Sequence, residues 1–108
     1  MKKDSHMIHV IAVVTAKPGR RAELIKELEA IIPLQRAEEG FVEVSLTMDS
    51  CGSKDRFGDD AFVMLEKWNS RETFEAHLAT PHLRSYNEQI RDRVANVAIH
   101  VLTEQERN

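Results

Sequence analysis

Two histidines lie close together in the second half of the chain, His77 and His82, on either side of a Thr80-Pro81 step. Imidazole is the side chain that most readily takes up and releases a proton near neutral pH. Thr is a favourable helix N-cap and Pro fits the first helical position, so a helix is predicted to begin at Pro81. The helix dipole would disfavour a cation at its second position. We therefore predict His82 as a general base and His77 as a residue that binds or orients the substrate.

The chain's single Trp and single Tyr, Trp68 and Tyr86, flank these histidines. Each offers ring surface and one hydrogen-bond donor, and with Glu66 they are predicted to bind the substrate. A structural interpretation stays open beside this one. Trp68 is in phase with Phe62 and Met64 on a predicted strand, which is typical of core packing, and Tyr86 lies on the apolar stripe of its helix. Glu66 fits either an ion pair or an orienting carboxylate.

No metal site is predicted. His77 and His82 are five residues apart across a helix break, whereas HExxH zinc sites place two histidines four apart on one helix. His9 and His100 belong to predicted strands and are interpreted as structural or interfacial. The single cysteine, Cys51, excludes a Cys-based zinc site and lies in a polar loop far in sequence from any candidate base. There is no Gly-rich phosphate-binding loop, so no cofactor is predicted.

These residues belong to one segment with clear structural signals. Residues 61–68 alternate in side-chain character with the two-residue period of a strand. Ser70 can cap a short helix that starts at Arg71 and ends before Pro81. The helix that follows carries a single apolar stripe, formed by Leu83, Tyr86, Ile90 and Val94.

The remaining elements are predicted from the same kinds of pattern. Residues 7–16 are rich in Val and Ile and indicate a buried strand. Residues 20–37 form an amphipathic helix that Pro33 should kink or split. Residues 41–49 alternate strictly between apolar and polar, and residues 96–103 indicate a last strand. The order is β-α-β-β-α-β, with the second helix broken in two.

This order indicates an α+β protein with a ferredoxin-like βαββαβ antiparallel sheet and helices on one face. The first and last strands are too apolar for the other face to be left in water, so we predict a homodimer with two sheets face to face, a dimeric α+β barrel. One domain is predicted over residues 7–103, with an N-terminal extension over residues 1–6 and a charged tail over residues 104–108.

Composition limits the classes of partner. The chain has 108 residues and a formal net charge of −3, so it lacks the basic field that binds nucleic acid or anionic lipid. The longest apolar run, Val10–Val14, is far too short to span a bilayer. With one cysteine and no signal-peptide pattern, a cytoplasmic location is expected.

Four segments resemble one known family: VIAVVTAKPGRRAEL, EEGFVEVSLTMD, VMLEKWNS and EAHLATPHLRSY. They are similar to the antibiotic biosynthesis monooxygenases, and most similar to the small quinol monooxygenase branch. The resemblance implies O2-dependent oxidation of a quinol-like or polycyclic dihydroxy-aromatic substrate, without flavin, haem or metal.

Haem degradation is the rival function among related barrels. Those proteins use an Asn on the first strand, and a Trp and a His on the second helical segment. Here His77 stands where the Trp is expected and Asn87 where the His is expected, and the first strand has no Asn. This argues against haem. Two alternatives stay open: an isomerase or processing enzyme for a small metabolite, and a non-enzymatic small-molecule binding or stress-response module.

Overall fold

The computed structural model describes residues 6–105. Residues 1–5 and 106–108, which make up most of the predicted extension and tail, lie outside the described part. The elements run in the order β1 (Ile8–Ala16), α1 (Arg21–Arg36), β2 (Phe41–Thr47), β3 (Ala61–Trp68), α2 (Arg71–Leu78), α3 (Pro81–Ile90), a 3₁₀ turn (Arg91–Arg93) and β4 (Val94–Thr103).

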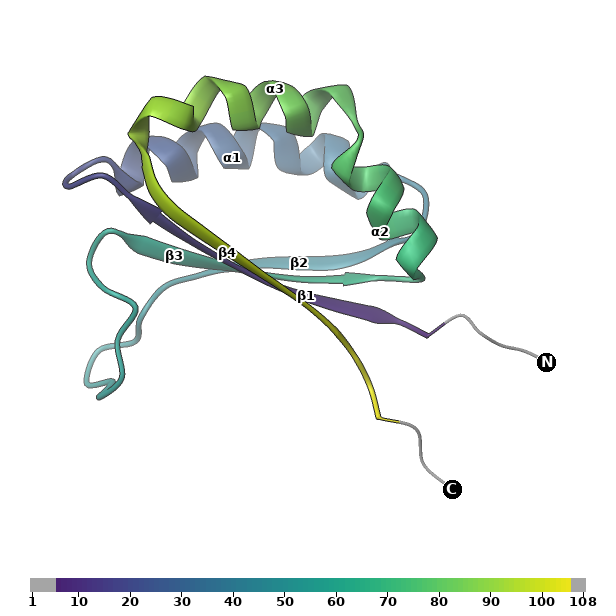
Figure 1. Cartoon of the computed structure of the whole chain (residues 1–108), viewed down its shortest axis with the longest axis horizontal. Helices are drawn as coiled ribbons and strands as arrows, with labels where there is room; N and C mark the ends of the chain where they lie inside the picture. The colour runs from purple at the N-terminus through teal and green to yellow at the C-terminus, as the bar shows by residue number, and fades with distance from the viewer. Residues whose placement is uncertain (1–5, 106–108) are drawn as a thin grey trace.

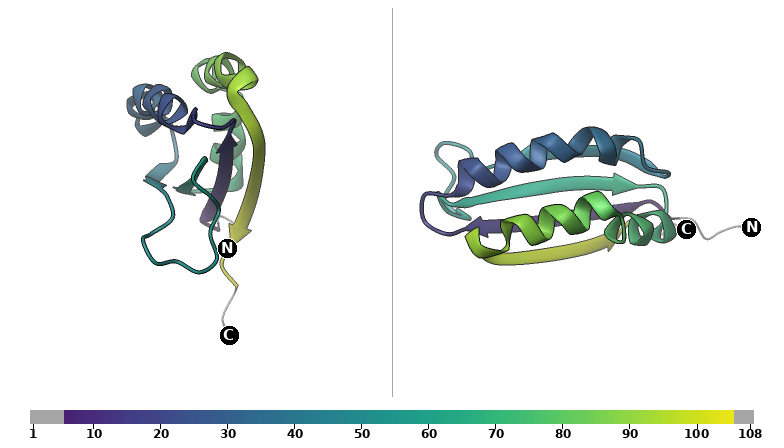
Figure 2. Two further views of the ribbon diagram at one scale, coloured as in Figure 1. Left: turned by 90° about the vertical axis from the view of Figure 1, so that its left-hand side faces the viewer. Right: turned by 90° about the horizontal axis from the view of Figure 1, so that it is seen from above.

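The four strands form one antiparallel sheet in the order β2-β3-β1-β4. Helices α1, α2 and α3 cover the same face of this sheet, and within residues 6–105 the opposite face carries no helix (Figures 1 and 2). This arrangement confirms the predicted ferredoxin-like fold. Among the described residues, no helix is long and apolar enough to cross a membrane.

The core lies between the sheet and the helices. Leu24 and Leu28, one helical turn apart on α1, are buried against Phe62 and Met64 of β3. The alternation predicted for residues 61–68 therefore places Phe62 and Met64 on the face that the helices cover. A second buried cluster at the other end of the sheet is centred on Trp68, which is fully buried.

Two expectations about element boundaries were wrong. Helix α1 continues through Pro33 to Arg36 as a single helix, so the split predicted at Pro33 is wrong. Pro33 is exposed and lies in the last turn, so a carbonyl that loses its helical partner there can be hydrated. Val94, expected on the stripe of the second helix, is the first residue of β4, because the 3₁₀ turn ends the helix earlier.

The apolar residues of β4 differ in position from the prediction. Val97, Ile99 and Val101 pair with Val14, Ala12 and Val10 of β1. Residues directly opposite each other in an antiparallel pair share a face, so these β4 side chains face the helices. They stay 41–53% exposed, so the helices leave this edge of the sheet partly uncovered. Most of the exposed apolar side chains of β4 therefore border the space under the helices, and only some of them lie on the face of the sheet without helices.

Candidate active site

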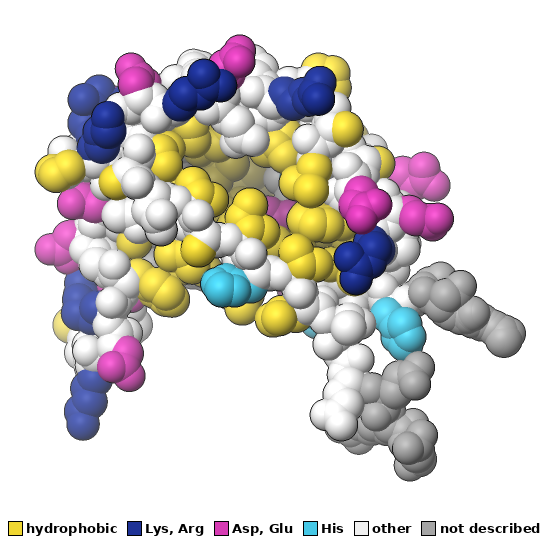
Figure 3. Space-filling view, in the orientation of Figure 1, with side chains coloured by type: hydrophobic (Ala, Val, Ile, Leu, Met, Phe, Trp, Pro, Cys, Tyr) yellow, Lys and Arg dark blue, Asp and Glu magenta, His cyan; other side chains and the backbone are white. Residues whose placement is uncertain are grey.

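A cavity of about 130 Å³ lies between the helices and the sheet. In Figure 3 it appears as a hollow lined by hydrophobic side chains. Most of its lining is apolar, and four side chains contribute polar atoms: Glu66, His77, Tyr86 and Asn87. A largely apolar pocket with a few convergent polar groups is the usual form of a site for a small organic ligand.

The break between α2 and α3 places the two predicted histidines. Ser70 and Thr73 form a capping box at the start of α2. At the start of α3, Thr80 Oγ1 accepts a hydrogen bond from the Leu83 N–H, and its hydroxyl donates to the His77 carbonyl at 2.8 Å. Both predicted helix starts are therefore confirmed. His77 ends up in the last turn of α2, and His82 is the second residue of α3.

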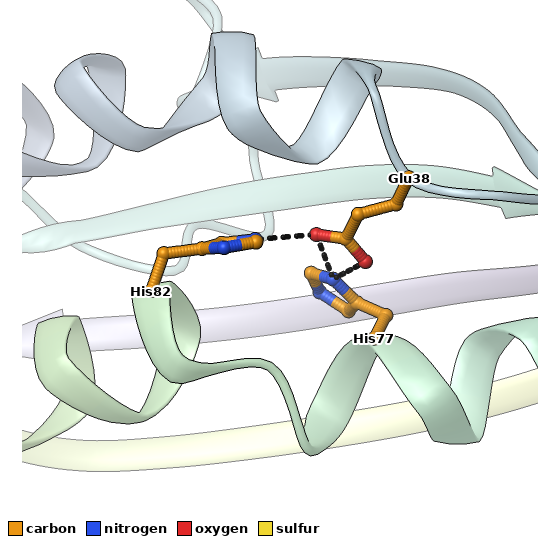
Figure 4. Close-up of side chains that lie close together, drawn as sticks. All are labelled: Glu38, His77 and His82. Atoms are coloured by element: carbon orange, nitrogen blue, oxygen red, sulfur yellow. Dashed lines mark hydrogen bonds and ion pairs between the residues drawn. The ribbon is translucent and has the colours of Figure 1, made fainter.

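Glu38, from the connection between α1 and β2, lies between the two histidines (Figure 4). Its carboxylate is 2.9 Å and 3.1 Å from His77 Nδ1 and 2.5 Å from His82 Nε2. A carboxylate only accepts hydrogen bonds, so Nδ1 of His77 and Nε2 of His82 are the nitrogens that carry protons. Nε2 of His77 is then the ring nitrogen left to accept a proton from a ligand.

Packing holds the His77 ring firmly. Its side chain is only 4% exposed, and the ring lies 4.6 Å from the Trp68 ring between centroids, tilted by 31°. The Trp68 indole N–H donates to Glu66 Oε1 at 2.9 Å. Glu66 is therefore an orienting carboxylate for Trp68, one of the two roles open from the sequence, and it also borders the cavity.

Tyr86 borders the same cavity, but its hydroxyl is already engaged. It donates to the Leu24 carbonyl at 3.1 Å in a buried position. Burial, followed by the charge of Glu27, raises the pKa of Tyr86 above its ordinary value. The phenol therefore stays protonated at neutral pH, where it can pack against a ligand but cannot act as a base.

The structure brings together three of the five predicted site residues. His77, Glu66 and Tyr86 line one cavity, whereas Trp68 is fully buried beneath His77 and is not among the lining residues. His82 does not line it either. Its side chain is 20% exposed and borders a second, outer hollow between α1 and α3, with Ile31 and Gln89. Of the two histidines, His77 is the one placed to reach a ligand in the cavity.

Glu38 was not among the site residues predicted from the sequence. It is 39 residues from His77 and 44 from His82, in a loop outside the predicted elements. The only local signal is a pair of acidic residues before Gly40, and nothing in the pattern separates Glu38 from its exposed neighbour Glu39. Glu38 also bears on the metal-site prediction, which compared only the spacing of the two histidines. Its carboxylate and the two ring nitrogens lie within 4.8 Å of one another, so Glu38 adds a third possible metal donor.

Comparison with known proteins decides the family. The sequence model described as "Antibiotic biosynthesis monooxygenase" matches residues 7–89. The chain belongs to the antibiotic biosynthesis monooxygenase family. Within this family it is similar to "Probable quinol monooxygenase YgiN" of Escherichia coli (strain K12), with 32% identity over 100 residues that cover 89% of this chain and 96% of the relative.

Solved structures show the same family fold. PA3566 from Pseudomonas aeruginosa superimposes with a TM-score of 0.79 at 28% identity, covering 97% of this chain and all of that one. Rv0793 from Mycobacterium tuberculosis gives a TM-score of 0.78 at 27% identity, covering 94% of this chain and 97% of its own. Family membership, together with a monooxygenase relative, supports an enzyme with a small-molecule substrate.

Proposed function

We propose that this protein is a cofactor-independent monooxygenase that oxidises quinol-like aromatic substrates with O2. The observation that carries the proposal is the position of His77 at the polar end of an apolar cavity, with its Nδ1 held by Glu38. A flat apolar ring fits such a lining, and a phenolic hydroxyl on it would meet the free Nε2 of His77. The similarity to a quinol monooxygenase supports the same substrate class.

The first step is transfer of the phenolic proton to His77 Nε2. Glu38 fixes the tautomer that leaves Nε2 unprotonated, and its negative charge stabilises the imidazolium that forms. The stack on Trp68 restricts the ring to this orientation. In this scheme His77 is the base and Glu38 is the residue that positions it, so the roles differ from those predicted from the sequence.

Deprotonation prepares the substrate for O2. Ground-state O2 is a triplet and reacts slowly with closed-shell molecules, but an electron-rich phenolate can give up the first electron itself. In the overall reaction, one oxygen atom enters the ring and the other leaves as water. The quinol is oxidised to the quinone level and supplies both electrons for that water, so the balance needs no other reductant. The cavity contributes by excluding bulk water from the reacting ring.

Oxygen consumption tests this function. With a panel of hydroquinones and naphthohydroquinones, the protein should accelerate O2 uptake above the autoxidation rate measured without protein. The activity should survive EDTA, because proton removal by His77 requires no metal. A rate equal to the blank for every quinol, or activity that appears only after flavin is added, would contradict the proposal.

We further propose that the working form is a homodimer joined through the helix-free face of the sheet. This face carries a groove of about 450 Å³ lined by apolar Ile11, Leu65 and Leu102 beside the charged pair Lys67 and Glu43. Leu65 and Leu102 are 42% and 48% exposed. A second copy laid face to face would cover both leucines.

The dimer should persist at micromolar concentration and bury more than about 1,600 Å² in total, as stable interfaces do. Sedimentation velocity on the unaltered protein measures this. Leu65→Arg places a charge in the proposed interface and should shift the protein towards monomer, whereas Val101→Arg changes a residue of similar exposure on the helix-facing side and should not. A folded monomer of the unaltered protein would contradict the proposal.

A further inference from the structure

We infer that Glu38, His77 and His82 form a binding site for a divalent transition metal ion of the Zn²⁺ type, and that the bound ion switches the His77 base off. The metal-site part rests on geometry alone. The inhibitory part rests on the proposed function of His77. No other feature of the described residues places three nitrogen and oxygen donors of this kind together.

The donor set matches the chemistry of this class of ion. Two imidazole nitrogens and one carboxylate are common ligands for Zn²⁺ and Co²⁺, whereas Mg²⁺ and Ca²⁺ prefer oxygen donors throughout. In a tetrahedral site with bonds of about 2.0–2.1 Å, neighbouring donors lie about 3.3 Å apart. The nitrogen–oxygen distances here are 2.5–3.1 Å. All three donors lie within 4.8 Å of one another. Insertion of an ion therefore requires the nitrogens to move away from the carboxylate and towards each other, by about an ångström each.

His82 gives the site a route of entry from solvent. Glu38 and His77 are 12% and 4% exposed, so both are shielded, while His82 is 20% exposed and borders the outer hollow. A water molecule from this side can complete the tetrahedron, as in zinc sites with three protein ligands. Three different segments supply the ligands, so a bound ion would tie the α1–β2 connection to the start of α3.

Metal binding changes the protonation of His77. In the free protein Nδ1 carries the proton that it donates to Glu38, and Nε2 holds the lone pair. An ion bound at Nδ1 needs the lone pair of that nitrogen, so the proton of the neutral ring must move to Nε2. Nε2 then becomes a donor and can no longer accept a phenolic proton. The same three side chains would thus orient the base when metal-free and block it when metal-bound.

Co²⁺ and Zn²⁺ added to the full chain test the inference. Co²⁺ should develop the intense visible absorption of a tetrahedral complex, and titration calorimetry should give one high-affinity Zn²⁺ per chain. Glu38→Gln and His82→Asn should each weaken Zn²⁺ binding by about 100-fold or more, since even outer-shell partners of a metal cost 10- to 100-fold. Glu39→Gln, the same change at the exposed neighbouring residue, should leave the affinity unchanged.

Two further measurements separate the site from the function. Nitrogen NMR of the His77 ring should show the proton moving from Nδ1 to Nε2 when Zn²⁺ binds, whether or not the protein turns over. Quinol oxidation by the unaltered protein should fall at least tenfold at saturating Zn²⁺ and recover with EDTA. No metal binding, or binding that survives both Glu38→Gln and His82→Asn, would overturn the site. Binding without inhibition in an active enzyme would overturn the switch.

Discussion

Replacing His77 with Gln should lower kcat for quinol oxidation by about 10²-fold or more while the fold is retained, because loss of a general base typically costs 10²- to 10⁴-fold. The Gln amide can still donate a hydrogen bond to Glu38, so the buried carboxylate keeps a partner. It cannot take a proton at neutral pH, so the loss isolates the proton transfer.

The matched control is His82→Gln, the same substitution at the other histidine bonded to Glu38. Because His82 does not line the cavity, its loss should reduce kcat by less than tenfold. Circular dichroism and thermal unfolding of both variants check that the fold is intact. If His82→Gln lowers kcat more than His77→Gln does, then His82 is the base, as predicted from its position at a helix start. The assignment of His77 as the base would then be wrong.

The fold was predictable because local patterns determine its elements. The two-residue alternation over residues 61–68 predicts which side chains of β3 share a face, and Phe62, Met64 and Trp68 are buried on the helix-covered face as expected. The helix starts at Ser70 and Thr80 follow from capping chemistry that involves residues only three positions apart. The split predicted at Pro33 was wrong because this residue is exposed in the last turn of α1. The helical position predicted for Val94 was wrong because a 3₁₀ turn ends the helix earlier. Neither cause is visible in the side-chain period.

The site was only half predictable. His77, Glu66 and Tyr86 could be named from residue type, because imidazole, carboxylate and phenol chemistry is visible in a sequence. Glu38 could not, because its role depends on how the loop before β2 lies against α2. That placement is a tertiary contact, in which Glu38 bonds to both histidines. A residue that controls this contact should therefore affect both stability and the site.

Gly40 is that residue, and Gly40→Ala should be the most destabilising alanine substitution in the loop. Gly40 has φ +82°, and a Cβ atom there would lie 2.3 Å from Cβ of Thr73. Thr73 cannot move freely, because it forms the capping box of α2 with Ser70. The Gly40 carbonyl also accepts a 2.7 Å hydrogen bond from the Asn69 N–H, which fixes the backbone on both sides. Relief of the clash would draw the loop, and with it Glu38, away from α2.

Gly19→Ala provides the control, since Gly19 has φ +80° but no atom within 4 Å of the added Cβ. It should cost only the left-handed backbone penalty, about 1–2 kcal/mol. Gly40→Ala should cost that penalty plus the clash, for a total above about 3 kcal/mol, a large part of the 5–15 kcal/mol typical of a folded domain. Urea unfolding at one fixed chain concentration measures both, because a dimer's midpoint depends on concentration.

Equal losses of stability in Gly40→Ala and Gly19→Ala would show that the loop does not pack on Thr73 as described. A larger loss at Gly40 that is accompanied by weaker Zn²⁺ binding would link this packing directly to the position of Glu38.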